Sequence, residues 1–201
     1  MSKQDYALIT RTFARTIWQK FIKAMEEYKL IEDGDIIWVP EDKSDTGTLA
    51  RFLVEMVGAF GMRHITVVRG EAPAEYNKIV APECFHDILY NNLWEMLYNG
   101  RIHSLLPKQK KGGATVIRPL YFVRRESINE WKVNSGLDFE SGIMDANKAE
   151  QITLIKELVD RMAATNDSVE NNVFGSVFNV DADMMVGYEL GGVHHEFLEK
   201  Y

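Results

Sequence analysis

The feature that most constrains the fold is a strand–helix–strand pattern in the first half of the chain. Asp35–Val39 is a short, mainly apolar run with β-branched residues, which is typical of a strand buried in a parallel sheet. Apolar residues at helical spacing then predict a helix from Leu49 to about Phe60, with Thr46 or Thr48 as its cap. A second β-branched run, His64–Gly70, completes the unit. This pattern favours an α/β fold with a mainly parallel sheet flanked by helices.

The next apolar run does not fit the pattern. Asn77–Ala81 has the composition of a strand, but only the six residues Glu71–Tyr76 separate it from the strand before it. A crossover between parallel strands needs about a dozen residues or more. We therefore expect either that this segment pairs in a way other than parallel or that it is not a strand of the sheet.

Further helices and another strand are expected along the chain. Residues 6–28 place apolar side chains at steps of four, which predicts a helix. Residues 86–99 form an apolar helix with Gly100 as its stop. A basic loop ending in Lys110–Gly113 then leads into a strand at residues 114–120.

These elements predict one domain. The chain has 201 residues, 46% of them apolar and 26% charged, which is enough to bury a core without disulfides or metals. We expect a single α/β domain over residues 1–201, with an N-terminal helix in 1–30, the core in 31–133 and a helical extension in 134–201.

The composition limits the classes of function. A net charge of −7 argues against a general nucleic-acid binder, because such binding depends on Lys and Arg neutralising phosphates. The single cysteine, Cys84, excludes an internal disulfide and favours a reducing compartment. The sequence has neither an apolar signal segment at its start nor an apolar run long enough to cross a bilayer. We expect a cytoplasmic protein with no membrane partner.

The positive charges are concentrated in one segment. There are no acidic residues from Met96 to Arg125, and the bases in this stretch are Arg101, Lys108, Lys110, Lys111, Arg118, Arg124 and Arg125. Such asymmetry in an acidic chain indicates one basic face. The alternative is ordinary charge clustering, in which Arg118 pairs with a core carboxylate.

Three segments together resemble one known family. They are Lys29–Asp35, Val116–Leu120 with the sequence VIRPL, and Val123–Ile128 with the sequence VRRESI. On these segments the chain resembles the PP-loop ATP pyrophosphatases that thiolate cytidine in tRNA. The resemblance implies a Rossmann-like fold of the adenine nucleotide alpha hydrolase type, ATP and Mg²⁺ as ligands, and tRNA as a partner. It also implies that tRNA or another anion could bind a basic rim made by Arg101, Lys108, Arg118 and Arg124. Arg125 stands where the resembled family has Glu, which increases the basic character of this rim.

The phosphate-binding loop of that family is altered here. The family carries Ser-Gly-Gly-Lys-Asp-Ser after its first strand, where the glycines let backbone N–H groups approach phosphate. The matching segment is Pro40–Leu49, in which Asp42 and Lys43 replace the glycine pair. A carboxylate at this position opposes phosphate by charge repulsion. Residual nucleotide binding would involve Lys43, Ser44, Asp45 and Thr46, whereas the alternative is an ordinary loop capped by Thr46.

Little of the other family signatures remains. Asp87 is retained at the start of a predicted helix, where it could bind Mg²⁺ or nucleotide, or simply complement the helix dipole. The Cys-x-x-Cys pair of the family is absent, so no iron–sulfur cluster is expected. Adjacent His194 and His195 lie near the C-terminus, where such histidines are usually solvent-exposed, and no metal is predicted.

Three hypotheses for function follow. The preferred one is a shortened, degenerate member of the PP-loop family that has lost catalysis and acts as a binding or partner module. The first alternative is an active, adenylating tRNA-modification enzyme with an altered phosphate loop. The second is a structural subunit that forms a homodimer or binds a protein partner through Phe13, Trp18 and Phe21.

Overall fold

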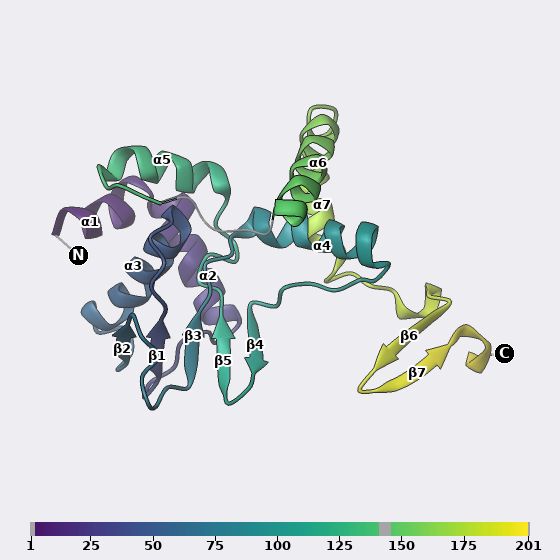
Figure 1. The fold of residues 1–201 in the computed structure, drawn as a ribbon, viewed down its shortest axis with the longest axis horizontal. Helices are drawn as coiled ribbons and strands as arrows, with labels where there is room; N and C mark the ends of the chain where they lie inside the picture. Colours follow the sequence, from purple (N-terminus) through teal and green to yellow (C-terminus); the bar gives the residue numbers. More distant parts are fainter. Residues whose placement is uncertain (1–2, 141–145, 201) are drawn as a thin grey trace.

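The computed structural model describes residues 3–140 and 146–200. Within these residues, five strands form a mixed sheet in the order β2-β1-β3-β5-β4, flanked by helices (Figure 1). Strands β1, β2, β3 and β5 are parallel, and β4 runs antiparallel to β5. The strands are β1 (Ile36–Val39), β2 (Thr66–Arg69), β3 (Lys78–Val80), β4 (Lys108–Lys111) and β5 (Ala114–Ile117). The expected α/β class with a mainly parallel sheet is confirmed.

The expectation for Asn77–Ala81 was wrong, because this segment contains β3, which pairs in parallel with both β1 and β5. The connection between β2 and β3 runs from the carboxyl end of β1 back to its amino end. Gly70 N donates to Val39 O at 3.1 Å, and Asn77 N donates to Ile36 O at 3.1 Å at the other end of the strand. Strands of three or four residues need a return path of only about 10–13 Å. An extended connection of eight residues covers this distance without a helix.

The basic loop before β5 is also a strand. Lys108–Lys111 forms β4 at the edge of the sheet, and Gly112 adopts a positive φ of 61° in the turn to β5. The charges of this strand are typical of an exposed edge, where they discourage pairing with another chain.

The N-terminal helical segment is interrupted. It comprises α1 (Lys3–Ala7), the π turns η1 (Leu8–Thr12) and η2 (Ala14–Trp18), and α2 (Gln19–Glu27). Apolar side chains at strict steps of four would drift around an α-helix of 3.6 residues per turn, and wider π turns reduce that drift. Phe13 and Phe21 are buried in the core, and Trp18 packs on Phe21 and Phe60. Phe13 and Phe21 are therefore core residues and not exposed anchors for a partner, whereas Trp18 is half-buried and its role as an anchor stays a prediction.

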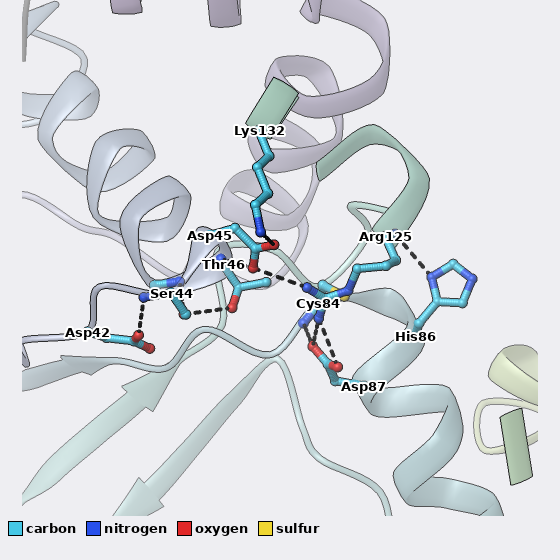
Figure 2. A network of polar contacts seen from close by, with 10 residues as sticks. Asp42, Ser44, Asp45, Thr46, Cys84, His86, Asp87, Arg125 and Lys132 are labelled. Carbon is cyan, nitrogen blue, oxygen red and sulfur yellow. Dashed lines mark hydrogen bonds and ion pairs between the residues drawn. The ribbon is translucent and has the colours of Figure 1, made fainter. Parts of the chain in front are cut away.

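Three helices place their N-termini close together, as Figure 2 shows for the side chains that begin them. They are α3 (Asp45–Ala59), α4 (Phe85–Asn99) and α5 (Arg125–Ser135). Helix α5 packs on α3 and on the π turns, whereas α4 packs on α6 (Ala146–Ala163) and α7 (Val169–Ser176). Helix α4 matches the predicted helix at residues 86–99 within one residue, and Gly100 follows it with a φ of 62°.

Residues 134–201 are not a purely helical extension. After α6, α7 and the short turn η3 (Ala182–Met184), the strands β6 (Gly187–Leu190) and β7 (Val193–Glu196) form a hairpin, followed by η4 (Phe197–Lys200). Gly191 and Gly192 both adopt positive φ between the strands, which two-residue hairpin turns require. Figure 1 shows the hairpin at the opposite end of the molecule from β2. In the described residues, no helix combines the length and the apolar character needed to cross a bilayer.

Candidate functional site

The loop after β1 leads directly into α3, which begins earlier than the sequence predicts. Ser44 is the cap, because its Oγ accepts a hydrogen bond from Gly47 N at 3.0 Å. Neither Thr46 nor Thr48 caps the helix, since both lie inside it. Asp45 is therefore the first helical residue, and its Oδ1 accepts from Thr46 N at 2.7 Å. The N–H groups of Thr46 and Gly47, which could otherwise meet an external anion, therefore already bond to side chains of this loop.

Asp42 occupies the space over the first turn of α3. Its Oδ1 accepts a hydrogen bond from Ser44 N at 2.8 Å. A Cβ placed on Gly47 would lie 2.2 Å from Asp42 Cγ, so only glycine permits this approach. Because a helix N-terminus attracts anions, the carboxylate of Asp42 takes a position that would otherwise suit a phosphate group.

Arg125 joins the two acidic residues that the sequence predicted separately (Figure 2). Its Nη1 lies 3.3 Å from Asp45 Oδ1, and its Nη2 lies 3.0 and 3.1 Å from the two oxygens of Asp87. Lys132, two turns further along α5, places Nζ 3.8 Å from Asp45 Oδ2. A guanidinium with hydrogen bonds to two carboxylates is a strong, directional contact.

Residues around Arg125 fix the geometry of this bridge. His86 is buried, and its Nδ1 accepts a hydrogen bond from Arg125 N at 3.1 Å. Asp87 closes the first turn of α4, with Oδ2 accepting from Cys84 N at 2.9 Å. Burial, together with the nearby Asp87 carboxylate, raises the pKa of the Cys84 thiol to about 12. Cys84 is thus a packed, neutral thiol and a poor nucleophile or metal ligand.

Lys43, the remaining predicted nucleotide-binding residue, points toward another segment. Its Nζ lies 3.2 Å from Glu140 and 4.0 Å from Glu41. These residues line a cavity of about 550 Å³ at the carboxyl ends of β1 and β2. Phe52 and Phe139 add aromatic surface to its wall. In an α/β sheet this edge is the usual place for a ligand.

The four bases predicted to bind an anion each pair with a carboxylate. The pairs are Arg101 with Glu95, Lys108 with Glu32, Arg118 with Glu83, and Arg124 with Glu170. Arg118 is buried and also donates to Leu106 O at 2.6 Å, so it is not available to an external anion. The other three are partly exposed, but the paired carboxylates offset their charge.

The residues present do not fit the ligands that the family resemblance implies. Mg²⁺ is usually held by carboxylate oxygens, but the carboxylates of Asp45 and Asp87 both bind Arg125. In the described part of the chain, no group of three or more His, Cys, Asp and Glu side chains could hold a metal ion. An iron–sulfur cluster requires several thiolates, whereas the sequence offers one buried cysteine.

The fold places the chain among α/β proteins with a mainly parallel sheet, in which the loop after β1 leads into a helix N-terminus. No protein-family model matches the chain. It is similar to a solved U34-tRNA thiolase, NcsA from Methanococcus maripaludis with its 4Fe–4S cluster, with a TM-score of 0.57 and 6% identity over 84% of this chain and 81% of that one. This likeness shows a shared fold.

Similarity in sequence points to the same group. The chain is 25% identical to tRNA-cytidine(32) 2-sulfurtransferase 2 of Francisella tularensis over 122 residues. The matched residues cover 59% of this chain and 49% of that protein. The match to tRNA-cytidine(32) 2-sulfurtransferase 1 of Francisella philomiragia is also 25% identical, over 59% and 48% of the two chains. The chain is therefore similar in sequence to curated tRNA-cytidine(32) 2-sulfurtransferases. It spans about half the length of the curated relatives it matches.

Sequence reasoning missed several residues of this site. It placed Asp45 and Asp87 near the ends of two helices, but it treated Arg125 only as an added base. The signal was a charge reversal, since Arg125 stands where the resembled family has Glu. The sequence identified Asp42 only as a charge that opposes phosphate, and its hydrogen bond from Ser44 N left no signal. The contact of His86 with Arg125 left none either, because it joins segments far apart in the sequence.

Proposed function

We propose that this chain is a binding or partner module related to the tRNA-thiolating PP-loop proteins, without ATP pyrophosphatase activity. The observation that carries the proposal is the position of Arg125 between Asp45 and Asp87. An arginine side chain supplies there the positive charge that a metal ion would bring. A triphosphate with its metal ion would have to displace this arginine and leave its charge without partners, which is costly in a partly buried site.

The loop supports the same proposal. Asp42 lies over the first turn of α3. Ser44 accepts a hydrogen bond from Gly47 N, and Asp45 accepts one from Thr46 N. A phosphate group would have to replace two carboxylates and a hydroxyl. Its approach would also be opposed by the negative charge of Asp42 and Glu41.

Calorimetric titration of the purified chain with Mg-ATP and with AMP tests this function. We expect no saturable heat up to millimolar nucleotide and no release of pyrophosphate. Asp45→Ala and Lys43→Ala are the matched variants, and Lys43 is exposed enough that its loss leaves folding intact. Saturable binding to the unmodified chain that is weakened in both variants would overturn the proposal.

The second candidate is an active, adenylating enzyme with an altered phosphate loop, and the cavity of about 550 Å³ beside that loop favours it. Arg51 and Arg69 line this cavity, but both pair with Glu55, at 3.3 and 2.7 Å. A nucleotide would therefore bind through its base and ribose more than through its phosphates. Binding of AMP as tight as that of Mg-ATP, with turnover of ATP, would support this candidate.

The relatives named above act on tRNA. We propose tRNA as a binding partner of residues 101–125. Because Arg101, Lys108 and Arg124 each pair with a carboxylate, RNA phosphates would have to compete for them. We expect weak binding that vanishes at physiological salt. An electrophoretic shift with bulk tRNA at two salt concentrations measures it, and binding that resists salt would point to an active tRNA site.

A further inference from the structure

The C-terminal hairpin of β6 and β7 extends from the domain without a core of its own (Figure 1). In the described part of the chain, the buried apolar core ends at Phe174, before the hairpin begins. Large apolar side chains in and beside the hairpin are exposed, and they include Val186, Leu190, Val193 and Leu198. A two-stranded hairpin is marginally stable at best when it stands alone in water. Such an exposed apolar surface marks a contact with a partner.

The two faces of the hairpin differ in chemistry. Leu190 and Val193 pair across the hairpin and therefore lie on one face. Glu189 and Glu196 lie on the opposite face, and both are exposed. Residues 187–196, which we call the arm, contain no Lys or Arg. The arm is thus apolar on one face and acidic on the other.

The outer strand of the arm has an open edge. Gly187, Tyr188 and Glu189 of β6 line a groove together with Arg101 and Ile102 of the same chain, whereas no residue of β7 lines it. Among the described residues, β7 pairs with β6 alone. An unpaired strand edge offers its N–H and C=O groups to another strand. A second sheet can therefore accept β7 at its edge.

The edge that suits the arm is β4, the last strand of the main sheet. Its outer side has no paired strand in the described part of the chain, and it has four residues, as β7 has. Lys110 and Lys111 are exposed on it, and the apolar Leu106 is half exposed just before it. These lysines repel a second basic edge but attract an acidic strand. Figure 1 shows the hairpin of the same chain well apart from β4.

We propose that the arm of one copy adds through β7 to the β4 edge of a second copy, and that the reciprocal contact closes a homodimer. Main-chain hydrogen bonds between the strands supply affinity, and the charges of Glu189, Glu196, Lys110 and Lys111 select the partner edge. Each copy offers one arm and one edge, so two copies satisfy each other. The inference goes beyond the function proposed above and does not depend on it, because neither strand contributes to the Arg125 bridge.

Sedimentation velocity of the full, nuclease-treated chain measures this contact without RNA, so its result is separate from that of the tRNA experiment. We expect the mean mass to rise toward that of two chains as the concentration increases through the micromolar range.

Two charge-reversed variants test the arm and the edge separately. The edge variant combines Lys110→Glu with Lys111→Glu, and the arm variant combines Glu189→Lys with Glu196→Lys. Each places like charges at the contact and should dimerise at least about tenfold more weakly than the unmodified chain. All four side chains are exposed, so both variants should fold, and an unchanged Tm checks this.

Mixing the two variants makes the outcome decisive. The arm of the edge variant is acidic and meets the basic edge of the arm variant, while the basic arm of the latter meets the acidic edge of the former. Equal amounts should therefore form a heterodimer, although neither variant forms a homodimer. Lys20→Glu with Lys156→Glu changes the net charge as the edge variant does, at exposed positions of α2 and α6, and should dimerise as the unmodified chain does.

Three results would overturn the proposal. The first is a chain that stays monomeric at every concentration, whether its arm remains free or folds onto its own β4. The second is growth beyond two chains, since a closed dimer leaves no arm or edge unused. The third is a dimer that both variants leave unchanged, or a pair of variants that does not associate on mixing.

Discussion

Arg125 directs its guanidinium at the carboxylate of Asp87, with Nη2 3.0 and 3.1 Å from the two carboxylate oxygens. Asp87 lies in the first turn of α4 and Arg125 is the first residue of α5. The same guanidinium reaches Asp45, the first residue of α3. One cation therefore ties together three helix N-termini, and each of these helices carries in its first turn an acidic residue that the helix dipole favours, namely Asp45, Asp87 and Glu126.

Replacing this cation with the residue of the resembled family should create a metal-dependent protein. Arg125→Glu would bring a third carboxylate against Asp45 and Asp87, so we expect a loss of about 2–3 kcal/mol in the free energy of unfolding. Millimolar MgCl₂ should raise the Tm of this variant, because three neighbouring carboxylates bind a divalent cation. Thermal unfolding with and without MgCl₂ measures the effect.

Arg125→Gln is the control for that experiment. It removes the cation without adding a carboxylate, and its Tm should not respond to MgCl₂ more than that of the unmodified chain. An Arg125→Glu variant as stable as the unmodified chain, with no response to MgCl₂, would show that the bridge does not organise the site.

The approach of Asp42 to α3 depends on Gly47. Gly47→Ala would place a Cβ 2.2 Å from Asp42 Cγ and force the loop to move, at a cost of about 1–3 kcal/mol. Adding Asp42→Gly should recover most of this loss, because it removes the clashing side chain. Equilibrium denaturation of the two single variants and the double variant gives the coupling free energy between Asp42 and Gly47.

Gly58→Ala, in the same helix, is the matched control. A Cβ on Gly58 would make an ordinary contact, 3.4 Å from Ile65 Cγ1, so alanine should be neutral or slightly stabilising through its higher helix propensity. If Gly47→Ala and Gly58→Ala had equal effects, the packing of Asp42 over α3 would not constrain the helix.

Loss of a buried ion pair beside β1 and β3 should lower the free energy of unfolding more than loss of a more exposed pair nearby. Lys78 Nζ lies 2.5 Å from Asp35 Oδ2, and both side chains are buried. Lys78→Met leaves the carboxylate of Asp35 without its cation, so we expect a loss of about 3 kcal/mol. Lys108→Met, which breaks a more exposed pair with Glu32, should cost less than about 1 kcal/mol. Urea unfolding of both variants checks the ranking, and similar losses would contradict it.

Glu95 should make stability depend on pH in the acidic range. Its hydrogen bond with Arg101, at 2.6 Å, lowers its pKa to about 2, and Asn99 contributes a further bond. A lowered pKa in the folded state stabilises the fold above the unfolded value of about 4.3, and this stabilisation is lost as the pH falls toward 2.

The measurement compares the unmodified chain with Glu95→Gln. At pH 7 the variant should be less stable by about 1 kcal/mol, a value reduced for solvent screening. The gap should shrink steadily below pH 4. A gap that is the same at pH 7 and pH 3 would show that the charge of Glu95 contributes nothing.

The strand–helix–strand unit of residues 35–70 could be read from the sequence because each of its elements has a local pattern. The start of α3 was misplaced by four residues, since Ser44 and Thr46 are both good caps and only the hydrogen bond from Gly47 N distinguishes them. The pairing of β3 was missed for a different reason. The rule for crossover length assumes strands of ordinary length, whereas β2 and β3, which this connection joins, are short enough for a direct return.

The sequence by itself determined the α/β class, the apolar positions of the core, and the acidic residue Asp87 at the start of one helix. These properties follow from local periodicity and residue type. Tertiary structure alone decided that Asp45 and Asp87 share Arg125, and that Lys108, Arg118 and Arg124 meet carboxylates of distant segments. Each of these contacts joins residues whose separation in the sequence carries no information about their distance in space, and charge acts only over that distance.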